Sequence, residues 1–317
     1  MLTVLTNKGR SLVSLLIFSL TLSLFSPLGF AYRAKHHPAK KANAVRFIVM
    51  GDWGRQGKMD QTKVAKMMAK EKKADFLLVT GDNFYEDGVK SVTDSQWTLS
   101  FENVYTAKTL QVPWYVVLGN HDYRGNAQAE VDYTQHSNRW KMPARYYSYD
   151  VQIDDSTTAT FFVLDTSPFI TSYQKEDKKY HVLEQPIDRQ LHWLDSALAN
   201  CKSQWKFAAG HHPVYAAGEK HGDTPEMIAQ VLPLFKKYNV QAYFCGHEHN
   251  LEHLKTENMD FFVSGGGSEG KGAATNAMSL YSEASCGFLT VSLTSKELKA
   301  DFTDSTGRVV NTSTVTR

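Results

Sequence analysis

The chain has 317 residues, of which 42% are hydrophobic and 12% aromatic, and its formal net charge at pH 7 is +2. This composition supports a sizeable core and excludes an intrinsically disordered protein. The length fits one large domain or two ordinary ones, and the near-balanced charge gives no support for a nucleic-acid or membrane-surface partner.

The N-terminus has the pattern of a secretory signal. Lys8 and Arg10 precede a mostly apolar stretch over residues 12–25, and the small residues Gly29 and Ala31 suit the ends of a cleavage site. The apolar stretch is short and is interrupted by Ser and Thr, which favours a cleaved signal over a transmembrane anchor. We therefore expect cleavage near Ala31, export to the periplasm or the cell exterior, and a mature form that is not held in a membrane.

The pattern along the chain predicts four segments. These are a signal peptide at 1–31, a flexible basic linker at 32–44, one folded domain at 45–305 and a C-terminal tail at 306–317. The linker contains histidines and lysines that could also bind a metal, but a solvated linker is the simpler interpretation. The folded segment contains no internal repeat, low-complexity tract or linker, which indicates a single domain.

Short apolar runs alternate with amphipathic helical patterns in this domain. Strands are expected at 46–50, 75–79, 114–118, 160–165, 205–209, 240–244, 261–264, 287–293 and 298–304. Helices are expected at 59–72, where Val64, Met67 and Met68 lie among lysines, and at 188–200. Early β-α-β units followed by strand pairs predict an α/β (mixed α+β) fold, with two mixed sheets packed face to face and helices outside.

Five short runs follow expected strands, and each has a leading glycine with Asp, Asn, His or Tyr after it. They are Gly51-Asp52-Trp53-Gly54, Gly81-Asp82-Asn83-Phe84-Tyr85, Gly119-Asn120-His121-Asp122, Gly210-His211-His212-Pro213 and Gly246-His247-Glu248-His249. Loops at strand ends converge on one crevice, so these side chains are expected to meet. Oxygen and imidazole ligands of this kind suit two neighbouring metal ions that hydrolyse phosphate esters.

Taken singly, each of these residues has an ordinary structural interpretation. Asp52 and Asp82 could be turn or helix-cap residues, and Tyr85 could be a packed aromatic. His247 and His249 are two apart and would point to the same side of an extended segment, which suits joint metal binding. Five motifs in order at strand ends make the functional interpretation the stronger one.

In these motifs the chain resembles the calcineurin-like metallophosphoesterases and, among them, the small purple acid phosphatases of the tartrate-resistant type. The likeness runs from Val45 to Asp304. Its distinguishing feature is Tyr85, three residues after Asp82, and one departure is Phe-Ala-Ala at 207–209 in place of a β-branched run. The resemblance implies that the folded segment is a metallophosphoesterase domain with a four-layer α-β-β-α sandwich.

The resemblance also implies a set of metal ligands. By this likeness one metal is held by Asp52, Tyr85 and His249, the other by Asn120, His211 and His247, and Asp82 bridges the two. The ordinary pKa of tyrosine is about 10, so only a strongly Lewis-acidic cation keeps a phenolate at acid pH, which points to Fe³⁺ in the first position. The second set is neutral apart from the bridge and suits a divalent ion, with Fe²⁺, Zn²⁺ and Mn²⁺ all left open.

These ligands lead to a mechanistic hypothesis in which two ions about 3.5–4 Å apart hold a phosphate monoester and a metal-bound hydroxide attacks phosphorus. His121 is the first candidate to protonate the leaving alcohol, with Asp122 as an orienting carboxylate. The resemblance gives His221 as a second substrate-side histidine, although the loop before it is longer than in the mammalian enzymes. His212 could face the substrate or be an ordinary loop histidine.

Three further features leave alternatives open. The charged segment 172–181 is typical of a solvated loop, while the family has at this place an exposed loop that covers the active site and can repress activity until it is cut. The glycines within 267–272 favour a plain turn over a phosphate loop, because the lysine and hydroxyl of a Walker motif are missing. Cys245 is expected to be a buried hydrophobe, and Cys201 and Cys286 could form a disulfide.

The function expected from this pattern is that of an exported acid phosphatase. Its substrates would be small phosphate monoesters, with phosphoproteins and nucleotides among them, and we expect a monomer without a nucleic-acid partner. One alternative is a divalent-metal phosphodiesterase or nucleotide hydrolase of the same superfamily, which Tyr85 argues against. The other is a non-catalytic secreted iron-binding protein, which the full ligand set argues against.

Overall fold

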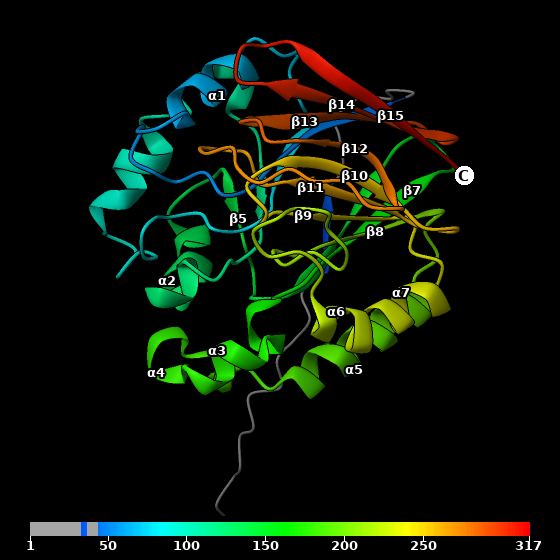
Figure 1. Cartoon of the computed structure of the whole chain (residues 1–317), viewed down its shortest axis with the longest axis horizontal. Helices are drawn as coiled ribbons and strands as arrows, with labels where there is room; N and C mark the ends of the chain where they lie inside the picture. The colour runs from blue at the N-terminus through cyan, green and yellow to red at the C-terminus, as the bar shows by residue number, and fades with distance from the viewer. Residues whose placement is uncertain (1–32, 37–43) are drawn as a thin grey trace, which may run out of the picture. The chain divides into compact units, whose positions relative to one another are not determined.

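The two mixed sheets are built from strands that lie far apart in the sequence. In the computed structural model, which describes residues 33–36 and 44–317, one sheet has eight strands and the other seven. The first runs in the order β1 (Arg33–His36), β6 (Tyr147–Gln152), β7 (Thr158–Val163), β8 (Trp205–Ala209), β9 (Ala242–Cys245), β11 (Asp260–Ser264), β10 (Leu251–Lys255) and β12 (Ser279–Glu283). The second runs β15 (Val309–Thr316), β14 (Glu297–Asp304), β13 (Gly287–Leu293), β2 (Val45–Met50), β3 (Phe76–Val79), β4 (Trp114–Val116) and β5 (Trp140–Lys141) (Figure 1).

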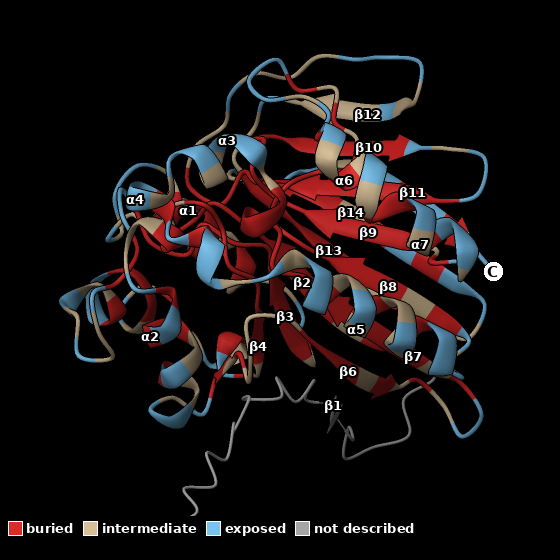
Figure 2. Cartoon of the chain, turned by 90° about the horizontal axis from the view of Figure 1, so that it is seen from below, coloured by how far each residue is buried: buried red, intermediate tan, exposed pale blue. Residues whose placement is uncertain are grey.

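An aromatic core lies between the sheets because strand side chains alternate between two faces. Phe161 of β7 belongs to this inter-sheet core, whereas the next residue, Phe162, packs with the outer layer. The Phe161 ring meets Phe47 of β2 and Phe76 of β3 edge-to-face, with ring centroids 5.4 and 5.6 Å apart. Figure 2 shows the strands largely buried and the exposed residues concentrated on helices and connections.

Helices cover the outer faces of the sandwich. α5 (Ile187–Asn200), α6 (Pro225–Gln230) and α7 (Leu232–Lys237) pack apolar side chains on the eight-stranded sheet, and α1 (Gln61–Met68) packs on β13. Figure 1 places α1 and the α5–α7 group on opposite sides of the two sheets, which confirms the predicted α-β-β-α sandwich. The shorter helices are α2 (Ala127–Asp132), α3 (Thr171–Lys175) and α4 (Asp177–Tyr180).

The three cysteines are free. The disulfide left open between Cys201 and Cys286 is therefore not formed in this structure. Cys245 is fully buried at the end of β9, as expected of a small hydrophobic residue.

The ends of the folded domain differ from the predicted boundaries. Residues 306–317, predicted as a tail, contain β15, which pairs antiparallel with β14 and buries Val315 opposite Leu298. This segment is rich in threonine, whose branched side chain favours a strand while its hydroxyl weakens the apolar signal. In the predicted linker, β1 pairs in parallel with β6.

The predicted signal peptide, and the rest of the predicted linker apart from β1 and residue 44, lie outside the described residues. Within the described residues, no helix combines the length and the apolar character needed to cross a bilayer.

The parallel strands of both sheets bring the five motifs together. β2, β3 and β4 are parallel in one sheet, and β8 and β9 are parallel in the other. Each motif begins within a few residues of the end of one of these strands. The two sheets are joined near these ends by a hydrogen bond of 2.7 Å from the Gly51 N–H to the Ser264 carbonyl oxygen. The topology therefore places loops from both sheets around one site.

Phe161→Ala should lower the free energy of unfolding by about 3–5 kcal/mol, because it removes a fully buried ring from the inter-sheet core. Urea denaturation with an unchanged m-value measures this loss. Leu183→Ala, at a residue that is 62% exposed, is the control and should change stability by less than about 0.5 kcal/mol. Equal effects for the two variants would contradict this account of the core.

Candidate metal centre

The motif residues leave their strands through unusual backbone turns. Asp52, Asp82 and His247 have φ angles of 59°, 49° and 68°, in the left-handed region that residues with a Cβ normally avoid. Each such residue costs about 1–2 kcal/mol. One hydrogen bond that holds this conformation runs 3.0 Å from the His247 N–H to Asp52 Oδ2. Three strained residues in one place indicate a functional constraint rather than a packing requirement.

The leading glycines allow the motifs to approach each other closely. A Cβ on Gly119 would lie 2.2 Å from both the backbone nitrogen and Oδ1 of Asp82. A Cβ on Gly246 would lie 2.4 Å from Oδ2 of Asp52. At these two positions any side chain would push a carboxylate out of place, which explains why glycine stands there.

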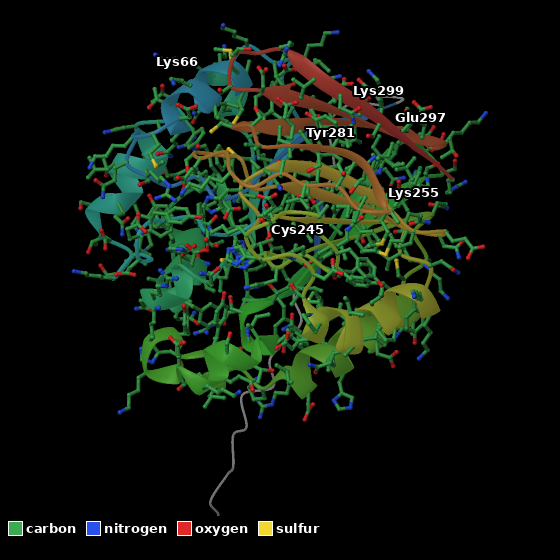
Figure 3. The ribbon with its side chains drawn as sticks, in the orientation of Figure 1. Lys66, Cys245, Lys255, Tyr281, Glu297 and Lys299 are labelled. Carbon is green, nitrogen blue, oxygen red and sulfur yellow. The ribbon has the colours of Figure 1, made fainter. Side chains whose placement is uncertain are left out.

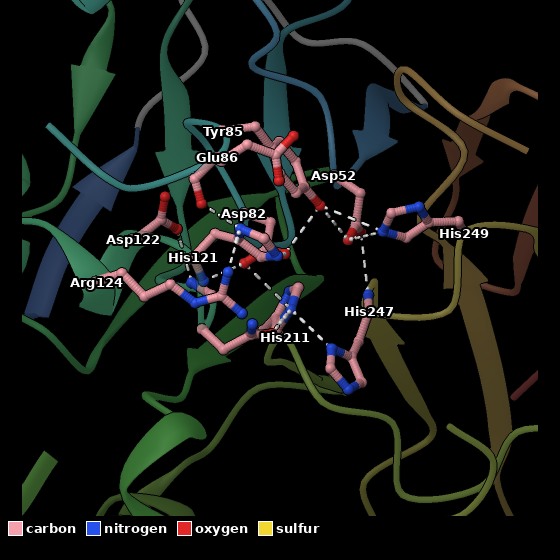
Figure 4. A network of polar contacts seen from close by, with 12 residues as sticks. Asp52, Asp82, Tyr85, Glu86, His121, Asp122, Arg124, His211, His247 and His249 are labelled. Atoms are coloured by element: carbon pink, nitrogen blue, oxygen red, sulfur yellow. Dashed lines mark hydrogen bonds and ion pairs between the residues drawn. The ribbon is translucent and has the colours of Figure 1, made fainter. Parts of the chain in front are cut away.

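Tyr85 lies at the centre of a first group of polar side chains (Figure 4). Its hydroxyl is 3.0 Å from Asp52 Oδ1, 2.8 Å from Asp82 Oδ2 and 3.3 Å from His249 Nε2. The same nitrogen of His249 is 3.3 Å from Asp52 Oδ1. All four side chains belong to buried residues, so the group is shielded from bulk water.

A second group is centred on His211. Its Nε2 is 3.2 Å from Asn120 Oδ1, 3.2 Å from His247 Nδ1 and 3.4 Å from Asp82 Oδ1. Asp82 therefore contacts both groups, the first through Oδ2 and the second through Oδ1. Figure 4 shows Asp82 between the two groups, the position that a bridging carboxylate requires.

Hydrogen bonds on the far side of two histidine rings determine which nitrogen carries the proton. Nδ1 of His211 is 2.9 Å from the Thr80 carbonyl oxygen, and Nδ1 of His249 is 3.2 Å from Glu269 Oε2. Both partners are acceptors, so Nδ1 carries the proton and Nε2 presents a lone pair to the site. This arrangement is the usual one for a histidine that ligates a metal.

The result is an excess of acceptors over protons. The Tyr85 hydroxyl offers one proton to three acceptor atoms in its group. In the second group, Nε2 of His211 faces the Oδ1 atoms of Asn120 and Asp82 with no proton to share between them. Buried acceptors that converge in this way are stabilised by a cation, so both groups fit a metal ion.

Electrostatics in the site support the same conclusion. Burial, together with the carboxylates of Asp52 and Asp82, raises the pKa of Tyr85 well above its ordinary value. The protein alone therefore favours the protonated phenol, and a phenolate there requires a bound cation. Burial and the neighbouring imidazoles lower the pKa of His247 well below its ordinary value, so this ring stays neutral and available as a ligand.

Glu269 is a site residue that the sequence analysis did not identify. It lies in the glycine-rich loop after β11, which contains neither helix nor strand. A hydrogen bond of 2.6 Å from the Ser268 hydroxyl to the Asp52 carbonyl oxygen ties this loop to the first motif. The Glu269 carboxylate holds Nδ1 of His249 and is in turn 3.5 Å from the guanidinium of Arg55. An acidic residue beside glycines in a loop was the signal that could have indicated it.

His121 lies beside Asp82 at the edge of the site. Its backbone N–H donates to Asp82 Oδ1 at 2.8 Å, and the ring Nδ1 is within hydrogen-bond distance of the Glu86 carbonyl oxygen. That carbonyl, rather than the predicted Asp122, orients the ring. The Asp122 carboxylate instead accepts hydrogen bonds from the backbone N–H groups of Asn83, Phe84 and Gly119. Asp122 therefore holds two motif loops together.

A cavity of about 750 Å³ opens beside the two groups, and its lining includes Asp82, Asn120, His121, His221 and His247. The His221 ring stacks on the His247 ring with centroids 3.9 Å apart. The contacts above and this stacking bring together all nine residues predicted for the site: Asp52, Asp82, Tyr85, Asn120, His121, His211, His221, His247 and His249.

The segment 172–181 is helical and lines this cavity, where the sequence favoured a solvated loop. It carries most of α3 and all of α4. The Tyr173 hydroxyl is 3.3 Å from His212 Nε2, and the Tyr173 and Tyr180 rings stack with centroids 4.2 Å apart. His212 is buried and lines the cavity behind this contact. The segment 172–181 therefore borders the cavity, and its role as a cover stays a prediction.

Known proteins resemble this chain over most of its length. Residues 45–251 match the family described as calcineurin-like phosphoesterase. Purple acid phosphatase 7 of Arabidopsis thaliana is 36% identical over 304 residues, which cover 90% of this chain and 90% of the relative. Tartrate-resistant acid phosphatase type 5 of Homo sapiens is 36% identical over 241 residues, which cover 71% of this chain and 73% of the relative.

Solved structures share the fold. GAP50, described as the anchor in the inner membrane complex of Plasmodium, matches with a TM-score of 0.75 at 27% identity and covers 86% of this chain and 89% of its own. The purple acid phosphatase PPD1 of yellow lupin (Lupinus luteus) matches with a TM-score of 0.62 at 16% identity and covers 89% of this chain and 55% of its own.

Gly119→Ala should destabilise the protein by about 1–3 kcal/mol and displace Asp82, because the added Cβ collides with the Asp82 backbone and carboxylate. Denaturation measures the loss of stability, and a crystal structure of the variant measures the displacement. Gly57→Ala is the control for the displacement: its φ of 74° is itself strained for alanine, but the nearest atom to a Cβ there is 3.2 Å away on a side chain, so Asp82 should keep its position. A Gly119 variant with unchanged stability would contradict the close approach of the two motifs.

Proposed function

The chain belongs to the calcineurin-like phosphoesterase family and, within it, to the purple acid phosphatases, and from this premise we propose that it hydrolyses phosphate monoesters at a dinuclear metal centre. The observation that carries the proposal is the convergence of buried acceptor atoms on both sides of Asp82. Two metal sites that share one carboxylate are suited to holding and cleaving a phosphate ester.

The proposed ligands follow the two groups of side chains. One ion would be held by Asp52, Tyr85 and His249, the other by Asn120, His211 and His247, with Asp82 as the bridge. Tyr85 supports Fe³⁺ in the first position, because its raised pKa means that only a strongly Lewis-acidic ion can hold it as a phenolate. The neutral ligands of the second group support a divalent ion, for which Fe²⁺, Zn²⁺ and Mn²⁺ are candidates.

The side chains around the ligands would complete the reaction. When bound, the two ions lower the pKa of a water molecule and offset the negative charge that develops on the phosphate. The Nδ1 of His121 donates to the Glu86 carbonyl oxygen, so its Nε2 would donate a proton to the leaving alcohol from the imidazolium form, which acid pH favours. His221 lines the same cavity and would hydrogen-bond the phosphate or the leaving group.

The cellular setting is part of the proposal. The N-terminal pattern supports export to the periplasm or the cell exterior after cleavage near Ala31. The substrates proposed are small phosphate esters, and nucleotides and phosphoproteins are further candidates. The protein would act as a monomer.

The activity is tested by loading the protein with iron and zinc and measuring phosphate release from an aryl monoester and the matching diester, from acid to alkaline pH. We expect a preference for the monoester and an acid optimum. A preference for the diester at neutral or alkaline pH would support the divalent-metal phosphodiesterase instead. Metal uptake without phosphate release from either compound would support an iron-binding protein.

Tyr85→Phe should abolish the visible charge-transfer band expected of a tyrosinate bound to Fe³⁺ and weaken iron binding, because it removes the oxygen and keeps the ring. Absorption spectroscopy and measured iron content test this. Tyr149→Phe is the matched control, since its buried hydroxyl has no hydrogen-bond partner among the described residues, and this variant should keep the band. A band that persists in the Tyr85 variant would contradict the assignment of Fe³⁺ to this position.

A further inference from the structure

We propose that Glu248 is a positioning residue that holds His221 over the metal pocket. Glu248 lies between the candidate ligands His247 and His249 in the sequence, but its carboxylate bonds to a neighbouring loop. The inference rests on the proposed function, because it gives His221 a role toward the substrate.

Glu248 is fully buried, and its carboxylate accepts hydrogen bonds from two consecutive backbone N–H groups. Its Oε1 accepts hydrogen bonds from the N–H groups of His221, at 2.5 Å, and Gly222, at 2.6 Å. Both bonds are shorter than the distance of about 2.9–3.0 Å that is usual for an N–H···O hydrogen bond. One oxygen atom therefore fixes the backbone at the residue that carries the substrate-side imidazole.

The loop between β8 and α6 depends on such contacts, because it has no helix or strand of its own. Glu252 Oε2 accepts the Ala217 N–H at 2.9 Å, and Asp223 Oδ1 accepts the Ala216 N–H at 3.0 Å. These two bonds fix the first half of the loop. Of the three carboxylates, Glu248 is the one that reaches His221.

Gly218 shows that the loop closes tightly over the Glu248 carboxylate. A Cβ on Gly218 would lie 2.4 Å from both the carboxyl carbon and Oε2 of Glu248. The fit between the loop and the carboxylate therefore leaves no room for a side chain at this position. The position of the Glu248 carboxylate therefore requires glycine at 218.

The consequence of this contact is the placement of the His221 ring. It stacks on the His247 ring with centroids 3.9 Å apart and an angle of 27° between the planes, and both rings line the cavity. Glu248 directly follows His247 in the chain, so a single residue links the candidate ligand to the loop of the substrate-side histidine. Misplacing a group at a reacting centre by about 1 Å can cost about 100-fold in rate.

The test compares Glu248→Ala, Glu248→Gln, His221→Ala and the double variant Glu248→Ala/His221→Ala, all loaded with iron and zinc. On an alkyl phosphate, Glu248→Ala should lower kcat about 10- to 100-fold without changing metal content or the visible band. Glu248→Gln keeps one acceptor oxygen and should recover much of the activity. In the His221→Ala background, the Glu248→Ala change should add less than about twofold, because coupled residues are not additive.

Hydrogen exchange of the backbone N–H groups in residues 217–223 of the metal-free protein supplies a readout that does not depend on activity. Exchange should be faster in Glu248→Ala and close to wild type in Glu257→Gln, a control at an exposed glutamate. If Glu248→Ala does not fold, Gly218→Ala takes its place, since its Cβ displaces the same carboxylate.

The outcomes separate this inference from the proposed function. If the wild-type protein releases no phosphate, the proposed function fails, and the exchange data alone decide whether Glu248 holds the loop. If the wild type is active but the effects of Glu248→Ala and His221→Ala multiply independently, the positioning role is overturned. Loss of metal from Glu248→Ala together with the activity would overturn it as well.

Discussion

The polar groups around Asp82 include more hydrogen-bond acceptors than donors, and the rest of the structure depends on this constraint. Acceptor atoms of carboxylate, amide and imidazole groups lie 3.2–3.4 Å from one another there, and the Tyr85 hydroxyl is the donor in one group. In a buried site, acceptors without donors are costly. The site therefore favours cation binding, and in the metal-free protein the surrounding fold has to hold these groups together.

Two buried acids help the fold to hold these groups in place. Asp122 and Glu130 are buried near the same motif loops, and the Asn83 side-chain amide donates to both, at 3.1 and 3.0 Å. Burial and the neighbouring Glu130 raise the pKa of Asp122, and burial raises the pKa of Glu130 to about 8. The Asn83 amide therefore links the two buried acids to each other. For Asp82, burial opposes ionisation, while the hydrogen bonds that it accepts from the His121 backbone N–H and the Tyr85 hydroxyl favour the ionised form. The pKa values of the Asp82 and Asp122 carboxyl groups are therefore shifted in opposite directions.

The sequence predicted the features that depend on local pattern. Apolar runs followed by a glycine and a polar residue located the strands and the candidate ligands, because strand ends carry the site in folds of this kind. Features that depend on distant partners were not predicted. The direction of the Asp122 carboxylate and the contact of Glu269 with His249 are set by loops that meet only in the folded chain. The β15 strand was missed for a different reason, since its threonines conceal the alternation that marks a strand.

The partners of the histidines add to the asymmetry of the proposed centre. Nδ1 of His211, in the group with neutral ligands, donates to a backbone carbonyl, whereas Nδ1 of His249, in the group with Asp52 and Tyr85, donates to the Glu269 carboxylate. A carboxylate partner makes an imidazole a more basic ligand than a carbonyl partner does. The group with more anionic ligands therefore also has the more strongly donating histidine. The position of Glu269 is therefore a second argument, separate from Tyr85, for the proposed placement of the more highly charged ion on that side of Asp82.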